Sequence, residues 1–201
     1  MITFEEQIVK SYYNLKNYFT IENIPFSARK KSKGGKGRGE IDLIAVKLDK
    51  NSGIIKDIIH IEITASIVEK FPFVSKYKGS DEIYKLLKKF FINNSDEKLK
   101  EFYLGKWRYQ FVTSRFRKNI EILLRKRLKY WGAKITYLKE INGELFTRIE
   151  YDSKCKEIEI TPFTKILGEF KEKMKDKTEH YLSTSIRAMQ WWKIIESTKA
   201  I

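Results

Sequence analysis

Two apolar segments joined by a short polar turn constrain the fold of this chain most strongly. Residues 40–48 have the sequence Glu-Ile-Asp-Leu-Ile-Ala-Val-Lys-Leu, residues 54–64 are rich in β-branched side chains, and the turn between them is Asp49-Lys-Asn-Ser-Gly53. This pattern predicts two β-strands that pair antiparallel through the turn. Because strand side chains alternate between two faces, Asp42 and Glu62 each project from an otherwise apolar strand and are expected to converge.

A pair of converging carboxylates predicts a metal site. Burying a carboxylate without a partner is costly, and two such groups repel each other unless a cation lies between them. The chain has one cysteine and two histidines, which argues against a thiolate or histidine-rich site. The expected cofactor is therefore a hard cation, Mg²⁺ or Mn²⁺, held by Asp42 and Glu62. Glu40 shares a face with Asp42, but we interpret it as a solvent-facing charge at the strand edge.

The remaining pattern predicts a mixed α/β fold with one main sheet. A capping box of Thr3 and Glu6 begins a first helix, whose apolar positions extend to Phe19. The predicted elements that follow are strands at 26–29, 40–48 and 54–64, a helix from residue 80, a strand at 109–116, a helix at 119–131 and a strand at 134–141. This order is αβββαβ followed by a further αβ. We place a core at residues 1–141 and a C-terminal extension at residues 142–201, with strands at 146–151 and 156–160 and then helices.

The charge balance points to a polyanionic partner. Lys and Arg number 41 against 26 Asp and Glu, which gives a net charge of +15. Nucleic acid is the commonest partner for such an excess, and we expect DNA rather than RNA. A membrane partner is not expected, because no apolar run approaches the ~18 residues needed to span a bilayer and the N-terminus lacks a signal-peptide pattern. The expected location is the cytoplasm.

The motif residues resemble the PD-(D/E)xK nuclease superfamily. Gly39-Glu40-Ile41-Asp42-Leu43-Ile44, followed by a hairpin and by Glu62-Ile63-Thr64, is similar to the pattern of archaeal Holliday-junction resolvases, restriction endonucleases and the small YraN-like branch. The resemblance covers residues 3–92 as motif. It implies a restriction-endonuclease-like core, metal ligation by Asp42, Glu62 and the main-chain carbonyl of Ile63, and a catalytic acidic residue in the first helix. That residue is Glu6, or less favourably Glu5; the capping box explains Glu6 equally well.

One position departs from the family pattern. The family's lysine falls at position 64, where this chain has Thr64. We retain Thr64 as a catalytic position, and Lys70 and Lys76 are nearby candidates for a migrated lysine. His60 shares the face of Glu62 and is interpreted as a hydrogen-bonded sheet residue.

Basic side chains in two regions are candidates for nucleic-acid contact. The loop at 30–39 combines cations with glycines that let the backbone approach phosphates, and a second cluster follows the strand predicted at 109–116. The alternatives are a solvated loop and a charged outer helix face. The predicted contact residues are Lys31, Lys33, Lys36, Arg38, Arg115 and Arg117.

Together these features predict a Mg²⁺-dependent endonuclease that hydrolyses DNA, and superfamily members are often homodimers. A second hypothesis is a catalytically inactive module of the same fold that binds nucleic acid, with Thr64 marking the loss. A third is an assembly protein whose basic face docks an acidic protein.

Overall fold

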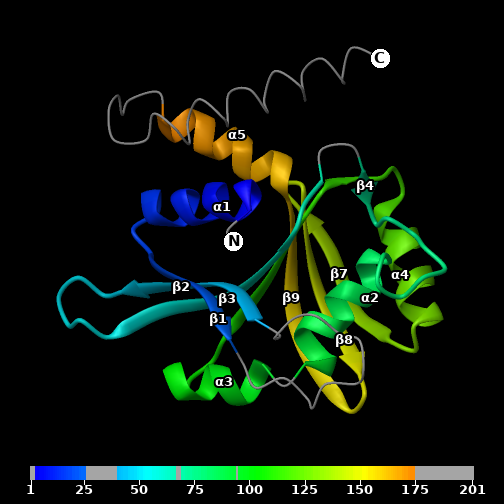
Figure 1. Cartoon of the computed structure of the whole chain (residues 1–201), viewed down its shortest axis with the longest axis horizontal. Coiled ribbons are helices and arrows are strands. Elements are labelled where there is room, and N and C mark those ends of the chain that lie inside the picture. The colour runs from blue at the N-terminus through cyan, green and yellow to red at the C-terminus, as the bar shows by residue number, and fades with distance from the viewer. Residues whose placement is uncertain (1–2, 26–39, 67–68, 94, 175–201) are drawn as a thin grey trace.

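The structure is a computed structural model that describes residues 3–25, 40–66, 69–93 and 95–174. Helices and strands make up most of this length (Figure 1). In chain order they are α1 (Phe4–Leu15), β1 (Phe19–Pro25), β2 (Glu40–Leu48), β3 (Ile55–Thr64), β4 (Lys70–Phe71), α2 (Glu82–Leu87), the π-helix η1 (Lys88–Ile92), α3 (Ser95–Phe102), β5 (Arg108–Thr113), β6 (Arg115–Phe116), α4 (Ile120–Tyr130), β7 (Lys134–Ile141), β8 (Glu144–Tyr151), β9 (Lys154–Pro162) and α5 (Phe163–Met174).

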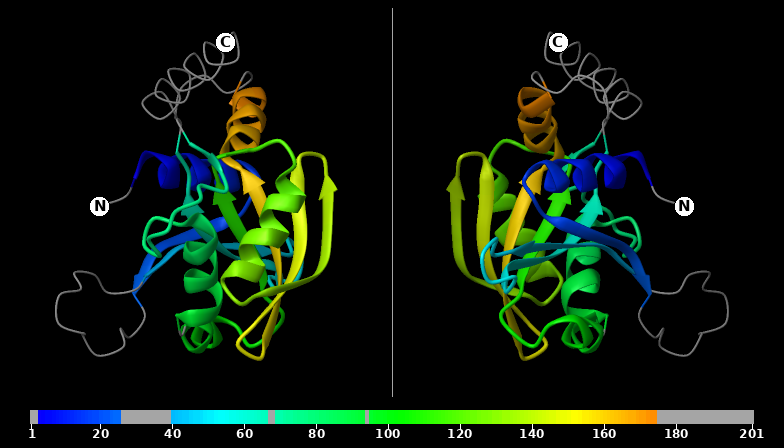
Figure 2. Two further views of the ribbon diagram at one scale, coloured as in Figure 1. Left: turned by 90° about the vertical axis from the view of Figure 1, so that its right-hand side faces the viewer. Right: turned by 90° about the vertical axis from the view of Figure 1, so that its left-hand side faces the viewer.

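A mixed seven-stranded sheet forms the centre of the molecule, in the order β1-β2-β3-β5-β9-β8-β7. The first three strands form an antiparallel meander, and β3, β5 and β9 run parallel to one another. The last three strands pair antiparallel, which leaves β7 at the edge of the sheet (Figure 2). A separate two-stranded pairing joins β4 to β6. The predicted mixed α/β fold is therefore confirmed.

Helices cover both faces of this sheet. On one face α1 and α5 lie side by side (Figure 1). Their apolar side chains pack with residues such as Leu43, Ile61 and Val112. On the other face α2, η1 and α4 pack against residues that include Phe111 and Ile160. Because strand side chains alternate, consecutive residues of β2 and β3 contribute to opposite layers. The polar residues that alternate with these apolar residues therefore point away from α1 and toward η1.

Strand β1 was not predicted from the sequence. The sequence placed a strand at 26–29, which lies outside the described residues, whereas β1 occupies Phe19–Pro25. Helix α1 ends at Leu15 because Asn17 adopts φ 63°, and the amide of Tyr18 donates to the carbonyl of Tyr13 at 3.1 Å. Phe19 continues the helical spacing of apolar residues, but its side chain is 66% exposed. The chain therefore turns before Phe19 and enters the sheet early.

The strands predicted at 146–151 and 156–160 are confirmed as β8 and β9. The boundary predicted between residues 141 and 142 falls at the start of the turn that joins β7 to β8. Asn142 and Gly143 form this turn with φ of 52° and 76°, values typical of a tight hairpin. Strand β9 lies between β5 and β8, so residues 154–162 belong to the middle of the sheet.

No helix in the described parts of the chain is long and apolar enough to cross a membrane.

Candidate active site

Asp42 and Glu62 meet on neighbouring strands, as the sequence predicted. The β2–β3 register aligns Leu43 with Ile61, which places Asp42 beside Glu62 on the face that points toward η1. The amide of Ile63 donates a hydrogen bond of 2.8 Å to Oδ2 of Asp42, and this bond fixes the orientation of the carboxylate. Asp42 is 8% exposed and Glu62 is fully buried. Two carboxylates therefore share a site that is almost closed to water.

Lys89 supplies the cation between them. Its Nζ lies 2.9 Å from Oδ1 of Asp42 and 2.6 Å from Oε2 of Glu62, and its side chain is 25% exposed. Neither Lys70 nor Lys76, the two lysines suggested by the sequence, takes this place. An ammonium group in contact with both carboxylates offsets their repulsion, which would otherwise oppose folding.

The π-helix η1 holds Lys89 at this point. The amide of Asn93 donates to the carbonyl of Lys88, five residues back, at 2.9 Å. Phe90 and Phe91 are buried in the apolar layer behind η1, so the segment is anchored next to Lys89. Single π-turns within helices are rare and frequently occur at functional sites.

Burial raises the pKa of both carboxyl groups, and the charge of Glu62 adds to the shift of Asp42. Burial, followed by the charge of Glu62, raises the pKa of Asp42 to about 7, although Lys89 opposes the shift. Burial also raises the pKa of Glu62, again against the effect of Lys89. For Lys89, burial alone would lower the pKa, but the charges of the two carboxylates outweigh it and raise the pKa above its ordinary value. Strongly perturbed titratable groups of this kind are typical of functional sites.

His60 contacts the other oxygen of Glu62. Its Nε2 lies 2.7 Å from Oε1 of Glu62, and both side chains are fully buried. Burial, with a smaller effect from the charge of Lys156, lowers the pKa of His60 to about 3. The imidazole is therefore neutral at physiological pH.

Thr64 lies farther along the same face of β3, at the position of the expected lysine. Its side chain is half-buried, and its Oγ1 has no hydrogen-bond partner among the described residues. No hydrogen bond joins it to Asp42 or Glu62 within that part of the chain. The cation in contact with Asp42 and Glu62 is Lys89, which belongs to η1.

Glu6 takes part in the capping box and also affects the site. Its Oε2 accepts a hydrogen bond of 2.7 Å from the amide of Thr3, and its own amide donates to Oγ1 of Thr3. Burial raises the pKa of Glu6, the Thr3 hydrogen bond lowers it, and the charge of Asp42 raises it further. The capping role is present, and the carboxylate is close enough to Asp42 to interact with it electrostatically.

The predicted nucleic-acid contacts are only partly within the described structure. Arg117 is exposed beside β4, where its amide donates to the carbonyl of Phe71 at 2.9 Å and its Nε to that of Lys70 at 3.3 Å. Arg115 is half-buried on β6, and its Nε has no hydrogen-bond partner among the described residues. The predicted contact residues Lys31, Lys33, Lys36 and Arg38 lie outside the described residues.

The donor set at the carboxylates fits a small hard cation of the Mg²⁺ type. Mg²⁺ is commonly held by one or two protein carboxylates and completes its shell with water and phosphate oxygens. No group of three or more histidine, cysteine or acidic side chains suited to a metal is found among the described residues. Asp42 and Glu62 would therefore be the only side-chain ligands from that part of the chain, and the ammonium of Lys89 lies between them.

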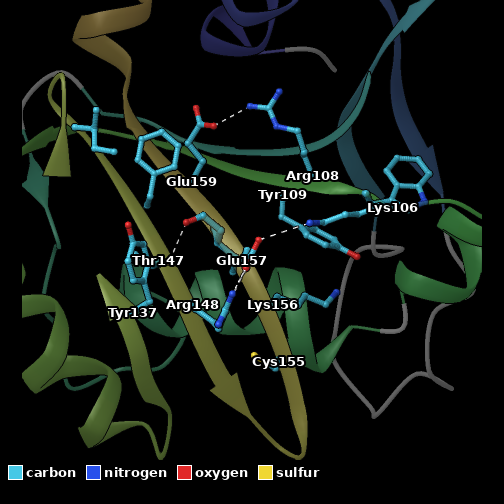
Figure 3. A pocket seen from close by; sticks show the side chains of 14 residues that line it. Lys106, Arg108, Tyr109, Tyr137, Thr147, Arg148, Cys155, Lys156, Glu157 and Glu159 are labelled. Carbon is cyan, nitrogen blue, oxygen red and sulfur yellow. Dashed lines mark hydrogen bonds and ion pairs between the residues drawn. The ribbon is translucent and has the colours of Figure 1, made fainter. Parts of the chain in front are cut away.

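A separate hollow of about 900 Å³ lies elsewhere, over β5, β7, β8 and β9 (Figure 3). Arg148 there pairs with Glu157, and Arg108 lies 3.0 Å from Glu159 and 2.7 Å from Asp57. The register of β8 and β9 aligns Arg148 with Glu157. Both residues lie on the same face of the sheet that α1 covers at neighbouring strands. The hollow therefore lies on the sheet face opposite to Asp42 and Glu62, and its cations are already paired with carboxylates.

No protein-family model, curated protein or solved structure matches this chain. The function of the candidate site is therefore inferred from its geometry.

Proposed function

We propose that this protein is a metal-dependent nuclease of the PD-(D/E)xK type that hydrolyses phosphodiester bonds in DNA, acting as an endonuclease. One observation carries the proposal: Lys89 contacts both Asp42 and Glu62 at 2.9 and 2.6 Å. These three residues supply the two acidic groups and the cation of the family pattern, with the lysine taken from η1 in place of Thr64.

The arrangement of elements supports the same proposal. A helix, an antiparallel meander, a helical segment and a strand parallel to the third meander strand follow one another as α1, β1–β3, α2–η1 and β5. This order is similar to the αβββαβ order expected of a restriction-endonuclease-like core, and the similarity supports the proposal. The two acidic residues lie on the second and third strands of the meander, which agrees with the expected pattern.

The residues of the site suit phosphodiester hydrolysis. Asp42 and Glu62 would hold Mg²⁺ or Mn²⁺, and the bound cation lowers the pKa of water and stabilises charge on a phosphate. Lys89 offers a positive hydrogen-bond donor beside these ligands, suited to orienting a water molecule or contacting a phosphate oxygen. The enclosure of Glu62 keeps bulk water away and strengthens each electrostatic contact.

The charge of the chain supports a nucleic-acid substrate. A net charge of +15 favours a polyanion, and cations on exposed segments gain affinity through counterion release. The proposed phosphate contacts are Arg115, Arg117 and the basic residues between positions 30 and 39, which lie outside the described residues. Contacts with the phosphate backbone carry no direct base information, so we expect the protein to recognise the structure of the DNA rather than its base sequence.

The test is cleavage of plasmid, single-stranded and branched DNA with Mg²⁺ or Mn²⁺. Wild type is compared with Asp42→Asn and Glu62→Gln, and with Glu40→Gln as a control for an exposed acidic residue two positions from Asp42. We expect metal-dependent cutting that both site variants abolish while DNA binding persists and Glu40→Gln still cuts. Equal cutting by Asp42→Asn and wild type would refute the proposed site.

A catalytically inactive nucleic-acid-binding module is the second candidate. The observation that favours it is Thr64, which takes the position of the family lysine and whose Oγ1 has no hydrogen-bond partner among the described residues. This candidate predicts salt-sensitive DNA binding, no cutting of any substrate, and no stabilisation of the folded protein by Mn²⁺.

A further inference from the structure

His60 places a polar ring in an apolar layer of the core. Its side chain is fully buried, and its ring centroid lies 5.1 Å from that of Phe90 and 5.8 Å from that of Tyr109. An apolar side chain would suit this layer without the cost of burying two ring nitrogens. The polar contact that the structure gives His60 is the one to Oε1 of Glu62 at 2.7 Å.

The two ring nitrogens of His60 have different surroundings. Nε2 lies 2.7 Å from Oε1 of Glu62, so a proton on Nε2 can donate to that oxygen. Nδ1 is then a bare acceptor, in agreement with its lack of a hydrogen-bond partner among the described residues. The opposite tautomer would leave a buried N–H donor unpaired, which is rare in proteins.

This bond leaves the two oxygens of Glu62 with separate roles. Oε1 is held by His60, while Oε2 faces Lys89 and, with it, Asp42. The carboxylate cannot rotate without losing one of these contacts. Outer partners of ligating carboxylates commonly affect metal affinity or activity ~10–100-fold.

We propose that His60 is a positioning residue that fixes Glu62 for metal binding by donating its Nε2–H to Oε1. The inference rests on the proposed metal-dependent function of the Asp42–Glu62 site. His60 acts through Glu62 and contacts neither metal nor substrate.

The test measures Mn²⁺ affinity of the full chain by calorimetry, independently of any cleavage. His60→Phe keeps an aromatic ring but removes the donor, and we expect it to weaken Mn²⁺ binding ~10-fold or more. His60→Gln retains a side-chain N–H that can donate to Oε1, and it should recover most of the affinity. Tyr109→Phe is the matched control, because it changes the other polar ring beside His60 and should bind Mn²⁺ as wild type does.

Nitrogen-15 NMR of the metal-free wild type provides a second readout that no metal enters. We expect the shifts of a ring that carries a proton on Nε2, and a proton on Nδ1 alone would overturn the inference even if His60→Phe fails to fold. Equal Mn²⁺ affinity of wild type and His60→Phe would refute the role of His60 alone. Absence of Mn²⁺ binding to folded wild type would refute the proposed function and this inference together.

Discussion

Replacing Lys89 by Met tests whether the site is built around a cation. Lys89→Met keeps a long, flexible side chain but leaves Asp42 and Glu62 facing each other without a counter-charge. Removing one partner of a buried ion pair typically costs ~3–5 kcal/mol. The side chain of Lys89 is 25% exposed whereas that of Glu62 is 0% exposed, so we expect the lower end, about 3 kcal/mol.

The assay is urea unfolding at mildly alkaline pH, above the pKa of about 7 of Asp42. At lower pH the carboxyl groups gain protons more readily, so the loss should shrink. Lys88→Met is the matched control, because Lys88 is the exposed neighbour on the same π-helix and should lose little stability. For a chain of this size, a loss of 3 kcal/mol corresponds to a decrease in Tm of ~6–12 °C.

Mn²⁺ should reverse this loss. A divalent cation restores the missing charge and no longer competes with the ammonium, so Mn²⁺ should bind Lys89→Met more tightly than wild type and stabilise it more. A metal at 100 times its Kd stabilises the folded state by ~2.7 kcal/mol. Lys89 does not neutralise the two carboxylates if Lys89→Met is as stable as Lys88→Met, or if Mn²⁺ raises the stability of both variants by the same amount.

Three further predictions concern the surroundings of the site. Calorimetry should show a Mn²⁺ affinity that is constant above pH 7 and decreases ~10-fold per pH unit below pH 7. The pKa of Asp42 is raised to about 7, so below this pH the metal must displace a proton from Asp42 in order to bind. An affinity that does not change with pH would contradict this. Thr3→Ala should cost ~1 kcal/mol in urea unfolding by removing the cap of α1, whereas Glu40→Gln should cost almost nothing. Asp81→Ala should cost ~3 kcal/mol, because the fully buried carboxylate pairs with Arg127 at 2.7 Å and accepts a hydrogen bond from Trp131; wild-type stability of this variant would refute that role.

The hairpin and its carboxylates could be predicted from sequence because the signal is local. The turn at 49–53 predicts the pairing of the two strands, but it does not set the register at the carboxylates. A β-bulge between Lys47 and Leu48 shifts the register by one residue, and this shift puts Asp42 and Glu62 on the same face. Glu6 was predictable as a cap for the same reason, since its partner lies only three residues away.

Lys89 could not be predicted in the same way. Lys85, Lys88 and Lys89 follow one another in a single helical segment, and nothing local distinguishes the one that reaches the carboxylates. The choice depends on how this segment packs on the sheet and on the π-turn, both of which are set by buried contacts of Phe90 and Phe91. The one sequence signal is a lysine directly beside two phenylalanines that prove to be core residues.

Strand β1 was not predicted, for a related reason. Ile8, Tyr12, Leu15 and Phe19 continue one helical spacing, so the pattern extends the helix past its real end. Asn17 is the only local indication of a stop, because asparagine tolerates the left-handed conformation that it adopts.

Single-turnover cleavage of a DNA substrate by wild type and Lys89→Met tests the central claim most directly. We expect wild type to cut DNA in a metal-dependent reaction. At saturating Mn²⁺, Lys89→Met should cut at a rate at least ~100-fold lower, whereas Lys88→Met should cut at the wild-type rate. Equal rates for Lys89→Met and wild type, or no cutting by folded wild type that binds DNA and Mn²⁺, would contradict it.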